Sequence, residues 1–180
     1  MAGIYIASIR QGQRLRRYWS TTAAGITSPP TFAGYRYYRM FITANNGDAN
    51  YTNVIEAEFR GSVGGADLVP ASPVTGILFS SQFATSGAGA AINAFNNNTG
   101  GDPWITAAGQ QINCYIGYDF GVATVVRECA YATGVSSPAG RAPKDFRWEA
   151  SNDGSTWTTL ASDTGRGATA GAFVSYATGL

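Results

Sequence analysis

The stretch at residues 145–157 constrains the fold of this chain more than any other. Phe146, Trp148 and Ala150 alternate there with charged residues, and a period of two is typical of a half-buried β-strand. The Asn-Asp-Gly run at 152–154 then predicts a tight turn, because glycine readily adopts a positive φ angle. The stretch therefore predicts a β-hairpin whose inner face carries aromatic side chains.

Short apolar and β-branched segments recur along the rest of the chain, separated by runs rich in Gly, Asn, Ser, Thr and Pro. Such segments are typical of strands, and none has the periodicity of a helix. The predicted strands cover residues 3–9, 35–43, 51–60, 77–79, 115–120, 124–131, 155–160 and 172–176. The range 155–160 is the second strand of the hairpin. Strands at this spacing predict an all-β protein, built as a β-sandwich or jelly roll.

The predicted strand at residues 51–60 carries two acidic side chains on one face. Its apolar residues at 55, 57 and 59 alternate with Glu56 and Glu58. If the apolar side chains face a core, the two carboxylates lie on the other face. We expect that face to be in contact with solvent, because carboxylates are seldom fully buried.

Basic residues are concentrated at the front of the chain. The first 47 residues contain six arginines and no acidic residue, whereas the remaining 133 contain six basic and eleven acidic residues. This is either simple unevenness in a chain of low charge or the mark of a basic arm. The second interpretation divides the chain into an extended basic arm or linker at residues 1–34 and a β-sandwich at residues 35–180.

A basic arm is expected to bind an acidic surface of a partner subunit, including another copy of the same chain in a homo-oligomer. Nucleic acid is not the expected partner, because the rest of the chain is acidic. The arm residues expected to make the contacts are Arg10, Arg14, Arg16, Arg17 and Trp19.

The N-terminus does not resemble a secretory signal, because Arg10 interrupts the first apolar run after too few residues. No apolar run approaches the length needed to cross a membrane. We therefore expect a chain that is made in the cytoplasm without a signal peptide and does not insert into a membrane. Cys114 and Cys129 are expected to be two separate buried thiols, with a disulfide as the alternative if their Cα atoms lie within about 7 Å.

Three motifs stand at long spacing in the second half of the chain. They are Ala-Phe-Asn at 94–96 followed by Trp104, Ile-Gly-Tyr-Asp-Phe-Gly at 116–121, and Ser-Asn-Asp-Gly-Ser-Thr-Trp at 151–157. Together they resemble the discoidin, or coagulation factor 5/8 type C, domain. That family has a galactose-binding-like jelly roll and includes many carbohydrate-binding modules. The tryptophans at motif positions are expected in the core: Trp104, Trp148 and Trp157.

Two further motifs come in an unexpected order. Tyr-Arg-Tyr-Tyr-Arg-Met at 35–40 and Ile-Glu-Ala-Glu at 55–58 are similar to the closing strands of that family, which there follow the hairpin. Here they precede it, which implies a circular permutation, and new termini are tolerated at loops. The alternative is a truncated tandem, in which residues 35–60 end one domain and 67–180 begin another. That alternative would leave open sheet edges.

The resemblance also implies a calcium ion, which many relatives hold between the loop before the tryptophan and a glutamate of the Ile-x-Glu-x-Glu strand. The matching residues are Asn96, Asp102 and Glu56. Calcium takes about six to eight oxygen ligands. Because Asn96 stands where the family usually has aspartate, we expect weak binding or an empty site.

The composition argues against an enzyme. The chain has no histidine, which excludes a Ser-His-Asp triad and a histidine-ligated metal. The acidic residues are scattered, and no pair has a spacing that suggests glycoside hydrolysis. Binding of a carbohydrate needs hydrogen-bonding side chains gathered in loops. The loop candidates are Asn97, Asn98, Arg141, Lys144, Asp163 and Arg166.

Two functions fit these observations. The first is a non-enzymatic structural protein of a bacteriophage tail, fibre or decoration, because the Tyr-Arg strand and the Gly/Asn/Thr-rich loops are similar in style to virion proteins. The second is an adhesion module that binds glycans of the host surface, although a shared fold does not by itself carry a ligand. Both can hold in one protein of a virus particle, which is the expected location.

Overall fold

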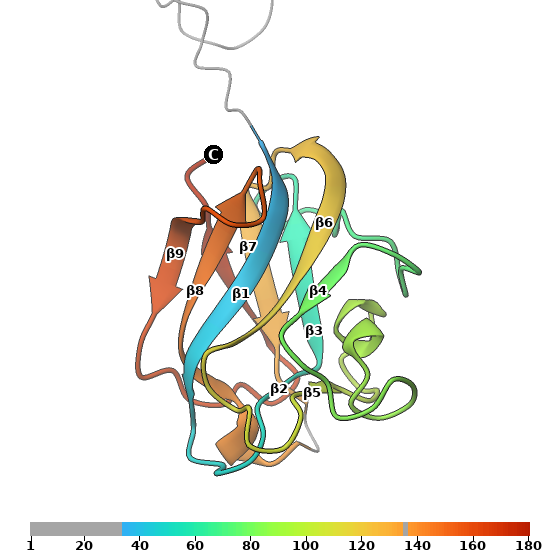
Figure 1. Ribbon diagram of the computed structural model, residues 1–180. Helices are drawn as coiled ribbons and strands as arrows, with labels where there is room; N and C mark the ends of the chain where they lie inside the picture. Colours follow the sequence, from blue (N-terminus) through green and yellow to red (C-terminus); the bar gives the residue numbers. More distant parts are fainter. Residues whose placement is uncertain (1–33, 135–136) are drawn as a thin grey trace, which may run out of the picture. The chain divides into compact units, whose positions relative to one another are not determined.

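The computed structural model describes residues 34–134 and 137–180. Two predicted segments therefore lie outside the described residues. They are the strand at 3–9 and the basic arm with Arg10, Arg14, Arg16, Arg17 and Trp19. The described part is all-β and its strands pair antiparallel (Figure 1), as predicted. Its strands are β1 (Tyr35–Asn45), β2 (Asn53–Val54), β3 (Glu56–Arg60), β4 (Ile77–Phe79), β5 (Trp104–Ile105), β6 (Cys114–Thr124), β7 (Glu128–Ala132), β8 (Pro143–Ser151), β9 (Thr158–Asp163) and β10 (Phe173–Ala177). Two 3-10 helices accompany them, η1 (Ala91–Phe95) and η2 (Ala139–Arg141).

Two sheets enclose one apolar core. The larger has the strand order β4-β6-β1-β8-β9 and the smaller the order β10-β7-β3, while β2 and β5 form a short third pair. Figure 1 shows the larger sheet lying across the smaller one, with β1 near its middle. Segments far apart in the sequence thus become neighbours.

The alternation of β1 explains its central place. Tyr38, Met40 and Ile42 point into the core and are fully buried, as expected for every second residue of a strand. Met40 lies opposite Ile116 of β6 on one side and Trp148 of β8 on the other. Since β1 pairs with both, the segments that a truncated tandem would separate lie in one sheet.

The core is rich in aromatic rings from both sheets. The ring of Phe59 in β3 packs edge-to-face on Trp148 of β8 at 5.7 Å and tilts against Tyr38 of β1 at 5.8 Å. Trp104 is also fully buried, and its Nε1 donates a hydrogen bond to the carbonyl of Ser81. Each such ring contributes roughly 1.5–3 kcal/mol through burial. The predictions for Trp104 and Trp148 are confirmed.

The hairpin turn is held by its own side chains. Ser151 Oγ accepts the N–H of Gly154 at 2.9 Å, while Asp153 Oδ1 accepts the N–H groups of Ser155 and Thr156 at 2.8 and 2.7 Å. Gly154 has a φ of +71°, so its lack of a Cβ is required. The Ser-x-Asp-Gly pattern thus has a structural cause in this chain.

Two sequence expectations about the hairpin need correction. The second strand begins at Thr158 and not at Ser155, because the turn bonds use the N–H groups of 155 and 156. Trp157 is not in the core either. It is half-buried, and the Arg39 guanidinium lies 3.8 Å from its ring centroid. Arg39 points away from the core because its neighbours Tyr38 and Met40 point into it.

The predicted strand at 51–60 is divided at Ile55. Before this residue, β2 pairs with β5, and after it, β3 pairs with β7. The N–H of Ile55 donates to the carbonyl of Ala132 as the chain passes from one sheet to the other. The prediction that both carboxylates of this strand contact solvent is wrong for Glu56, which is fully buried.

Cys114 and Cys129 are buried and not joined, so the prediction of separate thiols is confirmed. Burial raises the pKa of both thiols, which keeps them protonated. Among residues 34–134 and 137–180, no helix has the length and apolar character required to span a membrane.

Candidate functional site

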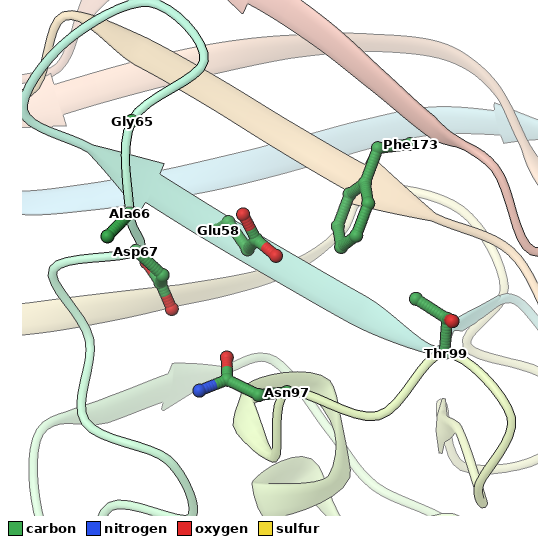
Figure 2. Close-up of a pocket in the computed structure, with 7 residues that line it drawn as sticks. All are labelled: Glu58, Gly65, Ala66, Asp67, Asn97, Thr99 and Phe173. Atoms are coloured by element: carbon green, nitrogen blue, oxygen red, sulfur yellow. The ribbon is translucent and has the colours of Figure 1, made fainter.

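A hollow of about 480 Å³ opens beside β3, one of the two edge strands of the smaller sheet. Figure 2 shows that side chains from separate elements surround it: Glu58 from β3, Asp67 from the following loop, Asn97 and Thr99 from the loop after η1, and Phe173 at the start of β10. Gly65 and Ala66 complete the wall. We refer to this region as the acidic hollow.

Asp67 fastens one wall of the acidic hollow to the edge strand. Its Oδ1 accepts the N–H of Phe59 at 2.8 Å and the N–H of Val69 at 3.2 Å, while Leu68 N–H donates to the carbonyl of Phe59. Its Oδ2 is buried and has no hydrogen-bond partner in the described structure. Burial raises the pKa of the Asp67 carboxyl to about 6, because the charged form loses its hydration.

Glu58 shares its cation with a second carboxylate. Arg60 Nε lies 2.6 Å from Glu58 Oε2, and Arg60 Nη1 lies 2.5 Å from Glu128 Oε1. The same guanidinium lies 5.2 Å from the ring centroid of Phe173. One arginine therefore serves two carboxylates here, and the neighbourhood keeps an excess of negative charge.

Glu56 lies behind the second wall. It projects from the same face of β3 as Glu58, and its Oε2 accepts the N–H of Asn98 at 3.0 Å. Its Oε1 is buried without a partner in the part of the chain that the structure describes. Burial raises the pKa of the Glu56 carboxyl to about 7, and the nearby charges of Asp67 and Glu58 act in the same direction.

The three residues predicted to hold calcium are only partly brought together. Glu56 and Asn96 each have a buried oxygen without a partner in the described residues, which fits a cation ligand. Asp102 instead lines a different hollow, of about 250 Å³, together with Asn53 and Arg141. No cluster of three or more His, Cys, Asp or Glu side chains with metal-binding geometry occurs in the described ranges. Calcium stays a prediction, with Glu56 and Asn96 as its donors.

The predicted sugar-binding residues do not form one site. Asn97 lines the acidic hollow, and the neighbouring Asn98 holds the loop by accepting the N–H of Gly100 at its Oδ1, at 3.0 Å. Arg141 lines the other hollow, where it pairs with Asp48 at 3.0 Å and lies 4.6 Å from the ring centroid of Tyr51.

The other candidates lie near the free end of β9. Asp163 pairs with Arg166 at 2.7 Å and accepts the Tyr176 hydroxyl at 2.7 Å, while the carbonyl of Lys144 accepts the N–H of Arg166. These contacts lower the pKa of the Asp163 carboxyl, the Tyr176 hydrogen bond most of all. Asp163 and Arg166 are thus engaged with each other and serve structure.

Sequence reasoning did not assign Glu58, Asp67, Thr99 or Phe173 to a ligand site. Asp67 follows a Gly-Gly-Ala turn, and Phe173 begins the last predicted strand, so neither stands in a recognisable motif. An acidic residue after a glycine turn is common, and only the packing of two loops beside β3 brings it near Asn97.

Comparisons of the chain with protein families, with curated proteins and with solved structures give no match. The resemblance to the discoidin domain is thus carried by the motifs alone.

Proposed function

We propose that this chain is a non-enzymatic carbohydrate-binding module that attaches a virus particle to glycans of its host. The observation that carries the proposal is the acidic hollow, in which carboxylates, an amide, a hydroxyl and an aromatic ring face one space. Its volume lies within the roughly 300–1,000 Å³ of small-ligand sites.

The chemistry of the lining supports a sugar over an apolar ligand. Glu58, Asp67, Asn97 and Thr99 offer acceptors and donors for ring hydroxyls. Phe173 is 37% exposed, so its ring offers an apolar surface for the C–H face of a pyranose. Because an aromatic ring is rigid, it contributes contact area at little entropic cost.

The fold supports the same proposal. The two antiparallel sheets, with β1 between β6 and β8, are what a permuted galactose-binding-like jelly roll would produce. Calcium bound at Glu56 and Asn96 would stiffen the wall that carries Asn97.

A glycan array probed with the purified chain tests the proposal. We expect saturable binding that is lost in the double variant Asn97→Ala, Thr99→Val and kept in Arg166→Ala, whose partner Asp163 lies away from the hollow. An array without saturable binding would reject the carbohydrate function. Loss of binding in Arg166→Ala alone would move the site to the end of β9.

The charge distribution favours a second function, assembly of the particle. Residues 35–180 carry eight basic and eleven acidic residues, a net charge of −3, whereas residues 1–34 carry four arginines and no acid. Opposite charges on two segments favour association between copies of the chain. Residues Arg10, Arg14, Arg16, Arg17 and Trp19 are then the partner-binding residues of a homo-oligomer.

The full chain with its four arm arginines changed to glutamine tests this second function. We expect the unmodified chain to be oligomeric by light scattering and the variant to be monomeric with an unchanged near-ultraviolet circular dichroism spectrum. Oligomers of undiminished size in the variant would reject a role of the arm charges in assembly.

A further inference from the structure

We propose that the acidic hollow selects an amino sugar whose amine is free and protonated. The inference rests on the proposed carbohydrate function and narrows it to one class of sugar. It follows from an imbalance of charge in the lining, which a neutral sugar would leave uncorrected.

The described cations do not balance the carboxylates around the hollow. Arg60 contacts Glu58 and Glu128 at once, and neither Asp67 nor Glu56 has an ion-pair partner among the described residues. Elsewhere in the described body, Asp119 pairs with Arg36 and Asp48 with Arg141. Asp102, Asp145 and Asp153 have no ion-pair partner among the described residues either, but none of them has a buried oxygen without a hydrogen-bond partner.

Buried atoms without partners mark the same place. The side chain of Glu56 is fully buried and its Oε1 has no hydrogen-bond partner in the described structure. This carboxylate faces the loop of Asn97 and Thr99, which forms a wall of the hollow. Asp67 Oδ2, in the opposite wall, is also without a partner. Unpaired buried carboxylates are costly. A cation in the hollow, beside Asp67 and in front of the wall that covers Glu56, offsets that cost through its charge.

An ammonium group fits this position. It is a compact donor of three hydrogen bonds, and Figure 2 shows the Glu58 carboxylate in the middle of the hollow, with Asp67 on one side, Phe173 on the other and Asn97 below. The second oxygen of Glu58, Oε1, is not engaged by Arg60. Thr99 and Phe173 lie on the far side of the space, where ring hydroxyls and a C–H face would contact them. A sugar with a free amine supplies both the ammonium group and the ring that these two sides of the hollow would contact.

Calorimetric titration of the full chain with three monosaccharides, in the presence of a chelator, tests the inference. Glucosamine carries the ammonium group, glucose replaces it with a hydroxyl, and N-acetylglucosamine replaces it with a neutral amide. We expect glucosamine to bind about tenfold more tightly than the other two, because a hydrogen bond to a charged partner is the stronger kind.

Asp67→Asn is the decisive variant. Asparagine keeps the Oδ1 acceptor that holds Phe59 and Val69 but removes the negative charge, so the loop should stay in place. We expect the preference for glucosamine over glucose, taken as the ratio of their affinities for the same variant, to fall to about twofold or less. Asp119→Asn, which removes a carboxylate that pairs with Arg36 outside the hollow, is the matched control and should keep the preference.

The outcomes separate the two proposals. Equal affinity for the three sugars overturns the selection of an amine and leaves the carbohydrate function standing. A preference for glucosamine that Asp67→Asn and Glu58→Gln both leave intact overturns the assignment to this hollow. No binding of any of the three sugars, together with an empty glycan array, overturns both.

Discussion

Two groups of charged side chains in this molecule differ in whether their carboxylates have partners. On the outer face of the larger sheet, Glu149 accepts hydrogen bonds from both Arg39 and Arg147. Arg39 also lies over Trp157 at 3.8 Å and near Tyr115 at 5.0 Å. Around the acidic hollow, by contrast, Glu56 and Asp67 keep buried oxygens without partners in the described residues.

This difference in charge balance suggests that the group around Glu149 is structural and the acidic hollow is functional. A carboxylate with two arginines and an aromatic neighbour is fully compensated, so the outer-face group stabilises the sheet and offers little to a ligand. Carboxylates that are buried and unpaired reduce stability. We infer that the hollow contains such carboxylates because a ligand supplies the missing positive charge. Departures from the rule that buried charges are paired tend to occur at binding sites.

The largest expected effect is the loss of the compensated carboxylate. Glu149→Gln leaves Arg39, whose side chain is 14% exposed, without its charged partner. We expect the free energy of unfolding in urea to fall by about 3–5 kcal/mol, as when one partner of a buried ion pair is removed. A loss below about 1 kcal/mol would mean that the outer-face group is not structural.

Glu56→Gln should act in the opposite direction. The pKa of this carboxyl is raised to about 7 in the folded chain, so its contribution to stability is complete below the unfolded pKa of about 4.5 and is lost as pH rises through 7. With a chelator present, the variant should gain about 2–3 kcal/mol at pH 8 and almost nothing at pH 4. Urea unfolding at both values measures this. A destabilised variant at pH 8 would show that the ionised carboxylate has a partner.

Calcium should produce a smaller change. If the chain binds calcium with a Kd of about 1 mM, then about 5 mM calcium adds roughly 1 kcal/mol, which thermal unfolding detects as a higher Tm. We expect the increase to disappear in Glu56→Gln and to persist in Asp102→Ala, because Asp102 lines the other hollow. Loss of the increase in both variants would restore the ligand set predicted from the sequence, and an unchanged Tm in the unmodified chain would remove the site.

The smallest expected effect belongs to Trp157. Trp157→Leu removes the aromatic face beneath Arg39 and should cost about 0.5–1 kcal/mol, the usual contribution of an exposed cation–π contact. Urea unfolding measures the change against Leu160→Ala, a change in a side chain that packs on the core. A cost of about 3 kcal/mol or more would place Trp157 in the core after all.

The amino-acid sequence by itself determined the local elements. Alternation and turn residues were enough to predict the strands at 35–43 and 77–79 and the hairpin with its turn at 152–154. The sequence also predicted that Trp104 and Trp148 are buried. Each depends on alternation or on turn residues that lie a few positions apart, and such short-range patterns act before any distant contact forms.

Only the tertiary structure decided where charges lie relative to one another. Glu56 looks like a solvent-facing residue in its strand and is buried because the loop at 96–98 closes over it, 42 positions further along the chain. Asp67 and Asn97 line one hollow only because their separate loops pack beside β3, and Phe173 reaches the same hollow from β10, two strands away in the sheet. No periodicity encodes such a meeting, since it depends on how the sheets stack and not on spacing along the chain.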